Sequence, residues 1–116
     1  MDQNLKIGLV GACGTGKSEL ASRLRLHGFQ VRHIAQEHSF APKMWKVISN
    51  PDILIYLHVS YLETLNRKNF IWTEKEYQEQ LHRLRHARVH ADLNIDTDNI
   101  SPDEVYQTIL TFIKGL

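Results

Sequence analysis

The sequence predicts an α/β fold, in which a small parallel sheet of about four strands lies between two layers of helices. Short apolar runs alternate along the chain with segments of helical periodicity, which is the element order of a covered parallel sheet. The run at 53–59, ILIYLHV, has six apolar or aromatic residues in seven, as a central strand buried on both faces requires. In three places a Ser or Thr precedes a Glu by three residues, a capping pattern that marks the start of a helix.

The first half of the chain supplies two predicted strands and two predicted helices. They are, in order, a strand over 5–10, a helix over 17–26, a strand over 30–35 and a short helix over 42–48. Leu20, Ala21 and Leu24 share one face of the first helix. Gly28 is placed to end that helix in the left-handed conformation, and Pro42 suits the first turn of the short helix.

The second half continues the alternation. Its predicted elements are the strand over 53–59, a helix over 60–67, a long helix from Thr73 to Ala91, a weaker strand over 91–95 and a last helix that begins at Pro102. The capping pairs are Ser60 with Glu63, Thr73 with Glu76 and Ser101 with Glu104. The prediction is therefore four strands and four or five helices in three layers.

Composition limits the classes of function. The chain has 116 residues, which favours a single domain over 1–116. Its net charge of +1 gives no reason to expect nucleic-acid binding. The one cysteine, Cys13, excludes an internal disulfide and fits a reducing, cytoplasmic setting. We expect no membrane partner, because no stretch approaches the roughly 20 apolar residues of a membrane span and the N-terminus lacks the pattern of a signal peptide.

A glycine-rich motif follows the first predicted strand. The residues Gly11, Ala12, Cys13, Gly14, Thr15, Gly16, Lys17 and Ser18 match G-x-x-x-x-G-K-[ST] at every fixed position. Glycines let the backbone curl so that its N–H groups point inward as an anion nest, and the start of the next helix adds further N–H groups. Lys17 would supply charge for the β- and γ-phosphates, and Ser18 would ligate Mg²⁺. Such short patterns also occur by chance, but the strand before and the helix after favour nucleoside triphosphate binding.

With this motif in place, the chain resembles the P-loop NTPases, and more narrowly the small P-loop kinases. PDILIYLHVS at 51–60 resembles the fourth strand of thymidylate and deoxynucleoside kinases. YLETLNRK, which follows, resembles the helix that leads into their lid, and this implies that Arg67 reaches the transferring phosphate. The segment from 91 to 113 resembles their last strand, loop and helix, with the loop near adenine. The resemblance implies ATP and Mg²⁺ as cofactors and a small-molecule acceptor.

The chain departs from that family between its second and third predicted strands. Such kinases have five parallel strands, but only about 15 residues separate Ala35 from Pro51. We therefore expect one strand with its helix, and most of the acceptor and lid region, to be missing. The second strand would then lie beside the first, in the strand order 2-1-3-4.

Glu37 is the candidate for the missing carboxylate on the Mg²⁺ side, because it follows a strand at the edge where ligands bind in open α/β sheets. The spacing from Glu37 to Trp45 also resembles a stretch of deoxynucleoside kinases in which the glutamate is a base toward the substrate hydroxyl. Glu37 is therefore a candidate metal ligand, a candidate base, or a solvated loop acid.

Further residues suggest chemistry less strongly. His82, His86 and His90 recur every four residues and would bind a metal or form a polar helix face. Arg88 is a second candidate for a site arginine, behind Arg67. Exposure of Trp45 and Trp72, together with an uncovered sheet edge, would allow a homodimer.

Two functions stay open at this point. The first is a small ATP-dependent kinase, in which Lys17 and Arg67 neutralise the γ-phosphoryl group while Ser18 and Glu37 hold Mg²⁺, or Glu37 is the base. The second is a nucleotide-binding sensor or interaction module with slow or no hydrolysis, which the shortness of the chain favours because a kinase must exclude water. The chain lacks the N-K-x-D pattern of guanine-binding enzymes.

Overall fold

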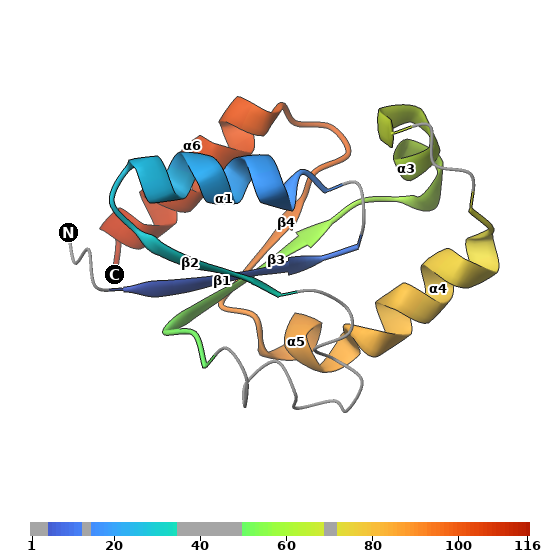
Figure 1. The fold of residues 1–116 in the computed structure, drawn as a ribbon, viewed down its shortest axis with the longest axis horizontal. Coiled ribbons are helices and arrows are strands. Elements are labelled where there is room, and N and C mark those ends of the chain that lie inside the picture. Colours follow the sequence, from blue (N-terminus) through green and yellow to red (C-terminus); the bar gives the residue numbers. More distant parts are fainter. Residues whose placement is uncertain (1–4, 13–14, 35–49, 69–71) are drawn as a thin grey trace.

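A parallel sheet between two helical layers forms the centre of the molecule (Figure 1). The structure is a computed structural model that describes residues 5–12, 15–34, 50–68 and 72–116. The strands are β1 (Lys6–Gly11), β2 (Gln30–Ile34), β3 (Ile53–His58) and β4 (Leu93–Asp96). The helices are α1 (Lys17–Leu26), α3 (Tyr61–Lys68), α4 (Glu74–Arg83), α5 (Arg85–His90) and α6 (Pro102–Lys114).

The strand order is β2-β1-β3-β4, and every pair is parallel. This confirms the predicted four-stranded sheet and its order 2-1-3-4. β1 and β3 are the inner strands, and their residues pair as Val10 with Tyr56 and Gly11 with Leu57. Because parallel strands all end at the same edge, the loop after β1 and the segments after β3 and β4 meet there.

The two faces of the sheet have separate cores. α1 and α6 cover one face (Figure 1), where Leu9 and Ile55 pack with Leu24 and Ile109. α5 covers the other face, where Val10, Leu54 and Tyr56 pack with Leu84 and Ala87. All residues of β3 from Ile53 to Leu57 are buried, as the apolar run predicted for a strand covered on both sides.

The prediction of one long helix after Thr73 is wrong in one respect, because the helix breaks at Leu84. That residue has φ −92° and ψ 0° and separates α4 from α5. Leu84 is 1% exposed and packs on the sheet with Ala87. In α5, after the break, Ala87 is buried against the sheet, whereas Val89 is 79% exposed.

Strand β4 is also displaced from its predicted range of 91–95. Asp92 bridges to the neighbouring strand before β4 starts, because its backbone N–H donates to the Leu54 carbonyl at 2.8 Å and its carboxylate accepts from the Leu54 N–H at 2.8 Å. The strand begins one residue later, at Leu93, and continues to Asp96.

The helix ends follow the predicted signals in most places. Thr73 and Ser101 both form complete capping boxes with the Glu three residues later. Gly28 has φ 104° at the end of α1, as expected. The predicted box at Ser60 is only half formed: its hydroxyl accepts from the Glu63 N–H at 3.3 Å, but its own N–H donates to another carboxylate. The predicted helix over 42–48 lies outside the described residues.

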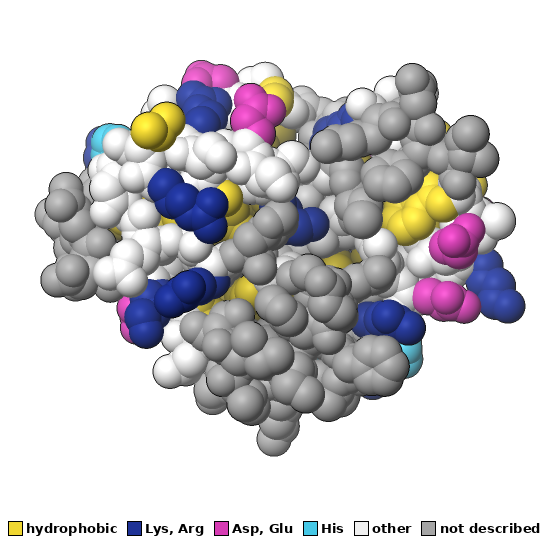
Figure 2. Space-filling model, viewed as in Figure 1, with side chains coloured by type: hydrophobic (Ala, Val, Ile, Leu, Met, Phe, Trp, Pro, Cys, Tyr) yellow, Lys and Arg dark blue, Asp and Glu magenta, His cyan; other side chains and the backbone are white. Residues whose placement is uncertain are grey.

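The surface carries both signs of charge. Figure 2 shows Lys and Arg side chains spread over one face of the molecule, with Asp and Glu among them. This agrees with a net charge of +1. No helix within the described ranges is both long and apolar enough to span a membrane.

Candidate phosphate-binding site

The loop between β1 and α1 has a backbone that only glycine accommodates at two positions. Gly11 ends β1, and a Cβ atom there would collide with the carbonyl oxygen of Leu57 on β3. Gly16 precedes α1 and has φ 82°, in the left-handed region that other residues rarely adopt. The predicted strand–loop–helix setting of the motif is therefore present, with Cys13 and Gly14 outside the described residues.

The ammonium group of Lys17 lies against the start of this loop. Its Nζ donates to the carbonyl oxygens of Gly11 at 2.5 Å and Ala12 at 3.1 Å. The neighbouring Thr15 is 7% exposed, and its Oγ1 is buried with no hydrogen-bond partner in the described part of the chain. Buried hydroxyls nearly always have a partner, so the Thr15 hydroxyl is a polar group suited to contact a ligand.

A cavity of about 730 Å³ opens at this loop, and we call it the loop cavity. Residues 15–20 of the loop and α1 form one side of it, and Arg23 of α1 extends that side. Glu63 and Arg67 of α3 line it as well. The segment from Thr97 to Val105, which includes the start of α6, completes it. The structure thus brings five predicted site residues to one cavity: Thr15, Gly16, Lys17, Ser18 and Arg67.

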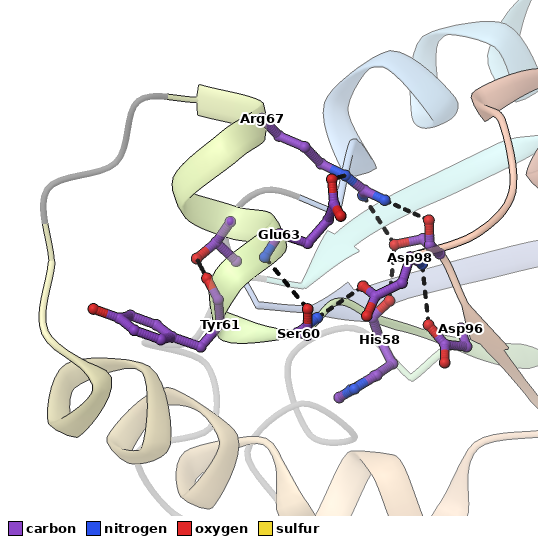
Figure 3. Close-up of polar contacts among 9 residues, drawn as sticks. His58, Ser60, Tyr61, Glu63, Arg67, Asp96 and Asp98 are labelled. Carbon is purple, nitrogen blue, oxygen red and sulfur yellow. Dashed lines mark hydrogen bonds and ion pairs between the residues drawn. The ribbon is translucent and has the colours of Figure 1, made fainter.

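Arg67 is held at the edge of the loop cavity by contacts within the protein (Figure 3). Its Nη1 donates to the Thr97 hydroxyl at 3.0 Å, and its Nη2 donates to the Thr97 carbonyl. Its Nε lies 3.6 Å from a carboxylate oxygen of Glu63, one helical turn earlier. The guanidinium therefore joins α3 to the segment that follows β4.

Hydrogen bonds fix that segment to the end of β3. The Thr97 hydroxyl and the Thr97 N–H both donate to the carbonyl oxygen of His58, each at 2.8 Å. The Asp98 carboxylate accepts from the Ser60 N–H at 2.9 Å. This bond occupies the N–H that the predicted capping box would have used, and Glu63 pairs with Arg67 instead.

Thr97 and Asp98 are site residues that the sequence did not predict. The structure places both in the wall of the loop cavity. The signal available was their place directly after a parallel strand, at the edge where ligands bind. The surrounding segment NIDTDN matches no nucleotide-binding pattern considered above, since it differs from the guanine-recognition pattern.

A cluster of aromatic residues holds α3 against α4. The Tyr61 hydroxyl donates to the Trp72 carbonyl at 2.7 Å, and the Trp72 indole N–H donates to the Thr64 hydroxyl at 3.0 Å. Tyr77 donates to the Val59 carbonyl at 2.6 Å. Burial raises the pKa of Tyr77, and the nearby Asp98 adds to this. The phenol therefore stays protonated and remains a donor at neutral pH.

The remaining predicted residues lie elsewhere. Glu37 falls outside the described residues, so its candidate roles stay predictions. Arg88 lines a different cavity from Arg67. His86 and His90 stack with ring centroids 4.1 Å apart, and His90 Nδ1 lies 2.9 Å from the His86 carbonyl. The described part of the chain contains no group of three His, Cys, Asp or Glu residues arranged to hold a metal.

Charges of both signs line the loop cavity among the described residues: Lys17, Arg23 and Arg67 are basic, and Glu19, Glu63 and Asp98 are acidic. Lys17 lies at the loop and Arg67 across from it, while Arg23 is paired with Asp103 at 2.9 Å. Ser18 is exposed at the first turn of α1 and lines the same cavity. Free N–H groups at a helix start, a lysine and a hydroxyl together can bind a phosphate chain and one ligand position of Mg²⁺.

Comparison with known proteins supports the fold. The structure of shikimate kinase from Aquifex aeolicus superposes with a TM-score of 0.64 at 13% sequence identity, over 96% of this chain and 97% of that one. The chain thus has the fold of a small P-loop kinase, as the resemblance implied. Neither a protein-family model nor a curated protein sequence matches it.

Proposed function

We propose that this protein binds ATP with Mg²⁺ and transfers the terminal phosphoryl group to a small-molecule acceptor. One observation carries the proposal: Lys17 and Arg67, from separate elements, line a single cavity that opens on a glycine loop at the start of a helix. Phosphoryl transfer relies on positioning and charge neutralisation more than on covalent chemistry. Two cations around one phosphate site supply that neutralisation.

The residues present fit a triphosphate. At Gly16 no atom lies within 4 Å of the place where a Cβ would stand, so a ligand can approach the loop backbone closely at the start of α1. Thr15 lines the same cavity, and its hydroxyl has no hydrogen-bond partner among the described residues. Lys17 now donates to the carbonyls of Gly11 and Ala12, and in the bound state it would donate to phosphate oxygens. Ser18 would be a Mg²⁺ ligand, and Glu37 remains the candidate for a second ligand or the base.

The transfer requires a hydroxyl-bearing acceptor, and the similar structure is that of a kinase whose name denotes a small-molecule substrate. We therefore include a hydroxyl-bearing small molecule as the acceptor in the function proposed for this chain. Arg67 would stabilise charge on the transferring phosphoryl group. Its guanidinium would first have to give up its hydrogen bonds to Thr97 and donate to the phosphate oxygens instead. Bound Mg²⁺ would supply additional charge neutralisation on the phosphate oxygens.

A nucleotide-binding sensor is the second candidate, and the contacts of Arg67 favour it. Its guanidinium is bonded to both oxygens of Thr97 and paired with Glu63. A protein that keeps this arrangement with nucleotide bound would hold the arginine away from the transferring group. It would then bind ATP without rapid turnover.

The test is calorimetric titration with a non-hydrolysable ATP analogue and Mg²⁺. We expect a dissociation constant on the order of micromolar for the wild type and a loss of at least about 100-fold in Lys17→Ala, because a charge-assisted contact to phosphate is removed. Lys114→Ala, in the exposed last turn of α6, is the matched control and should bind like the wild type. A folded wild type that does not bind the analogue would contradict both candidate functions.

A screen of acceptors then separates the two functions. ADP formation that rises sharply with one hydroxylated acceptor supports the kinase. Tight binding with negligible ADP formation under every acceptor supports the sensor. Both assays use the same protein sample that binds the analogue.

A further inference from the structure

A second cavity lies on the opposite face of the sheet from the loop cavity. Its volume is about 610 Å³, and it lies between α5 and the C-terminal halves of β3 and β4. Its polar lining residues are Tyr56, His58, Arg85, Arg88, Asn94 and Asp96. None of these residues lines the loop cavity, so their side chains call for a separate explanation.

The pairing of β3 with β4 produces this polar surface. Tyr56 lies beside Asn94 and His58 beside Asp96 in the parallel register. Residues two apart in a strand point to the same face, so all four side chains project on the α5 side of the sheet. Figure 3 shows the imidazole of His58 pointing away from Arg67, which lies above the other face.

Two polar atoms of this cavity are buried without hydrogen bonds. They are the Tyr56 Oη and the His58 Nδ1, which have no partner among the described residues. Tyr56 is 1% exposed and is among the largest fully buried side chains of the core. Buried polar atoms are almost always satisfied by protein, water or ligand, and phenylalanine would fill the same space with no unmet hydroxyl. The hydroxyl therefore points to a ligand in the cavity.

The charges of the cavity favour an anion. Arg85 and Arg88 reach it from α5, and Asp96 is the acidic side chain among the lining residues that the structure describes. Asp96 already accepts the Asp98 N–H at 3.0 Å. The Arg88 guanidinium carbon lies 5.9 Å from the centre of the Tyr56 ring, so a cation and a phenol hydroxyl flank the same space.

We propose that the second cavity binds a small oxyanion-bearing molecule, a phosphate or a carboxylate, which accepts hydrogen bonds from the Tyr56 hydroxyl and from His58 Nδ1. Arg88 balances its charge. Burial raises the pKa of Tyr56, which keeps the phenol protonated as a donor. His58 donates through Nδ1 when that nitrogen carries the proton, and this tautomer suits an oxyanion.

This second site does not depend on the proposed nucleotide site. The backbone of His58 and Thr97 separates the two cavities: the Thr97 side chain faces Arg67, whereas the His58 ring lies on the other face. Binding of an anion at the second cavity can therefore be measured in Lys17→Ala protein. If no anion binds at the second cavity, the phosphotransferase proposal still stands. If no nucleotide binds at the loop cavity, the proposed anion site still stands.

The test is a ¹H–¹⁵N NMR titration with inorganic phosphate, repeated with malonate, on the wild type and on Lys17→Ala. We expect the backbone amides of 54–58, 85–89 and 94–96 to shift with a dissociation constant on the order of 1 mM or tighter. They should shift in both proteins. The anion that binds more tightly shows whether the cavity prefers a phosphate or a carboxylate. Shifts confined to 15–20 would show binding at the loop cavity alone and would overturn the proposal.

Two variants make the assignment specific. Tyr56→Phe removes only the hydroxyl and should weaken binding at the second cavity by at least about fivefold, and Arg88→Gln by at least about tenfold. Arg83→Gln, an exposed arginine of α4 outside the cavity lining, is the control and should bind like the wild type. Equal affinities in all four proteins would mean non-specific attraction of anions, and the proposal would be wrong.

Discussion

Arg67 donates to both the hydroxyl and the carbonyl oxygen of Thr97, so a single residue after β4 accepts two bonds from α3. The same hydroxyl donates to the His58 carbonyl at the end of β3. Thr97 thus links helix α3, the last strand and the strand beside β1. The position of the arginine relative to the phosphate loop depends on this one buried side chain, which is 2% exposed.

Replacing Thr97 should therefore destabilise the fold more than its small size suggests. In Thr97→Val the Arg67 guanidinium loses an acceptor and the His58 carbonyl loses one of two donors. We expect a loss of about 1–2 kcal/mol in the free energy of unfolding, measured by urea denaturation. Thr97→Ser keeps the hydroxyl and should lose less. Equal losses in the two variants would show that packing of the methyl group, and not the hydroxyl, matters.

The loop glycines should differ in the cost of an added methyl group. Gly11→Ala drives a Cβ into the Leu57 carbonyl and should cost about 2–3 kcal/mol of stability. Gly16→Ala meets no atom but keeps a left-handed backbone, and should cost about 1–2 kcal/mol.

Gly115→Ala is the control for both glycine variants. Gly115 has φ −83°, and an added methyl group would make only ordinary contacts there, so the change should be within about 0.5 kcal/mol of neutral. Thermal unfolding of the three variants under one condition ranks them by loss of stability. If Gly16→Ala were the most destabilising, the close approach of β1 to β3 would not be the main constraint on the loop.

Two buried tyrosines should respond differently to removal of the hydroxyl. Tyr77 donates to the Val59 carbonyl at 2.6 Å, so Tyr77→Phe leaves a buried acceptor unpaired and should cost about 1–2 kcal/mol. The Tyr56 hydroxyl has no partner among the described residues, so Tyr56→Phe should be neutral or slightly stabilising in the absence of added anion. Urea denaturation in a buffer free of phosphate and carboxylates measures both. A large loss in Tyr56→Phe would reveal a hydrogen bond that the described residues do not show.

The sheet and the phosphate loop could be predicted because their signals are local. A run such as ILIYLHV is apolar at nearly every position because β3 is covered on both faces. The glycine spacing reflects backbone geometry at Gly11 and Gly16. The break at Leu84 could not be predicted, because the surrounding residues suit a helix and no glycine, proline or capping residue marks it, although the structure packs Leu84 in the core beside the sheet.

The polar wall of the loop cavity could not be predicted for a different reason. Thr97 and Asp98 acquire their partners only when β4 pairs with β3 and brings His58 and Ser60 alongside. The sequence separation between these partners gives no local pattern. The same pairing forms the second cavity, since it sets Tyr56 beside Asn94 on the opposite face.

Alkaline pH should destabilise the protein through its buried tyrosines. Burial raises the pKa of Tyr56 and of Tyr77 above the ordinary value of 10.0. The unfolded chain therefore releases these protons at lower pH than the folded protein, and stability that is present below pH 10 is lost as the pH rises through the folded values. Urea denaturation at about pH 9 and about pH 11 should show the loss. The double variant Tyr56→Phe/Tyr77→Phe should lose less over this interval, whereas an equal loss would assign the effect to other groups.

Removal of the Arg67 guanidinium should separate its catalytic role from its structural one. If Arg67 stabilises the transferring phosphoryl group, Arg67→Gln should lower turnover on the order of 100-fold while the affinity for the ATP analogue changes little. Arg67→Lys keeps the charge but loses the fork that reaches both oxygens of Thr97, so it should recover part of the turnover. Thr97→Val isolates the structural contribution, because it disturbs the same contact and leaves the guanidinium in place. A turnover in Arg67→Gln equal to that in Thr97→Val would mean that the arginine only positions α3.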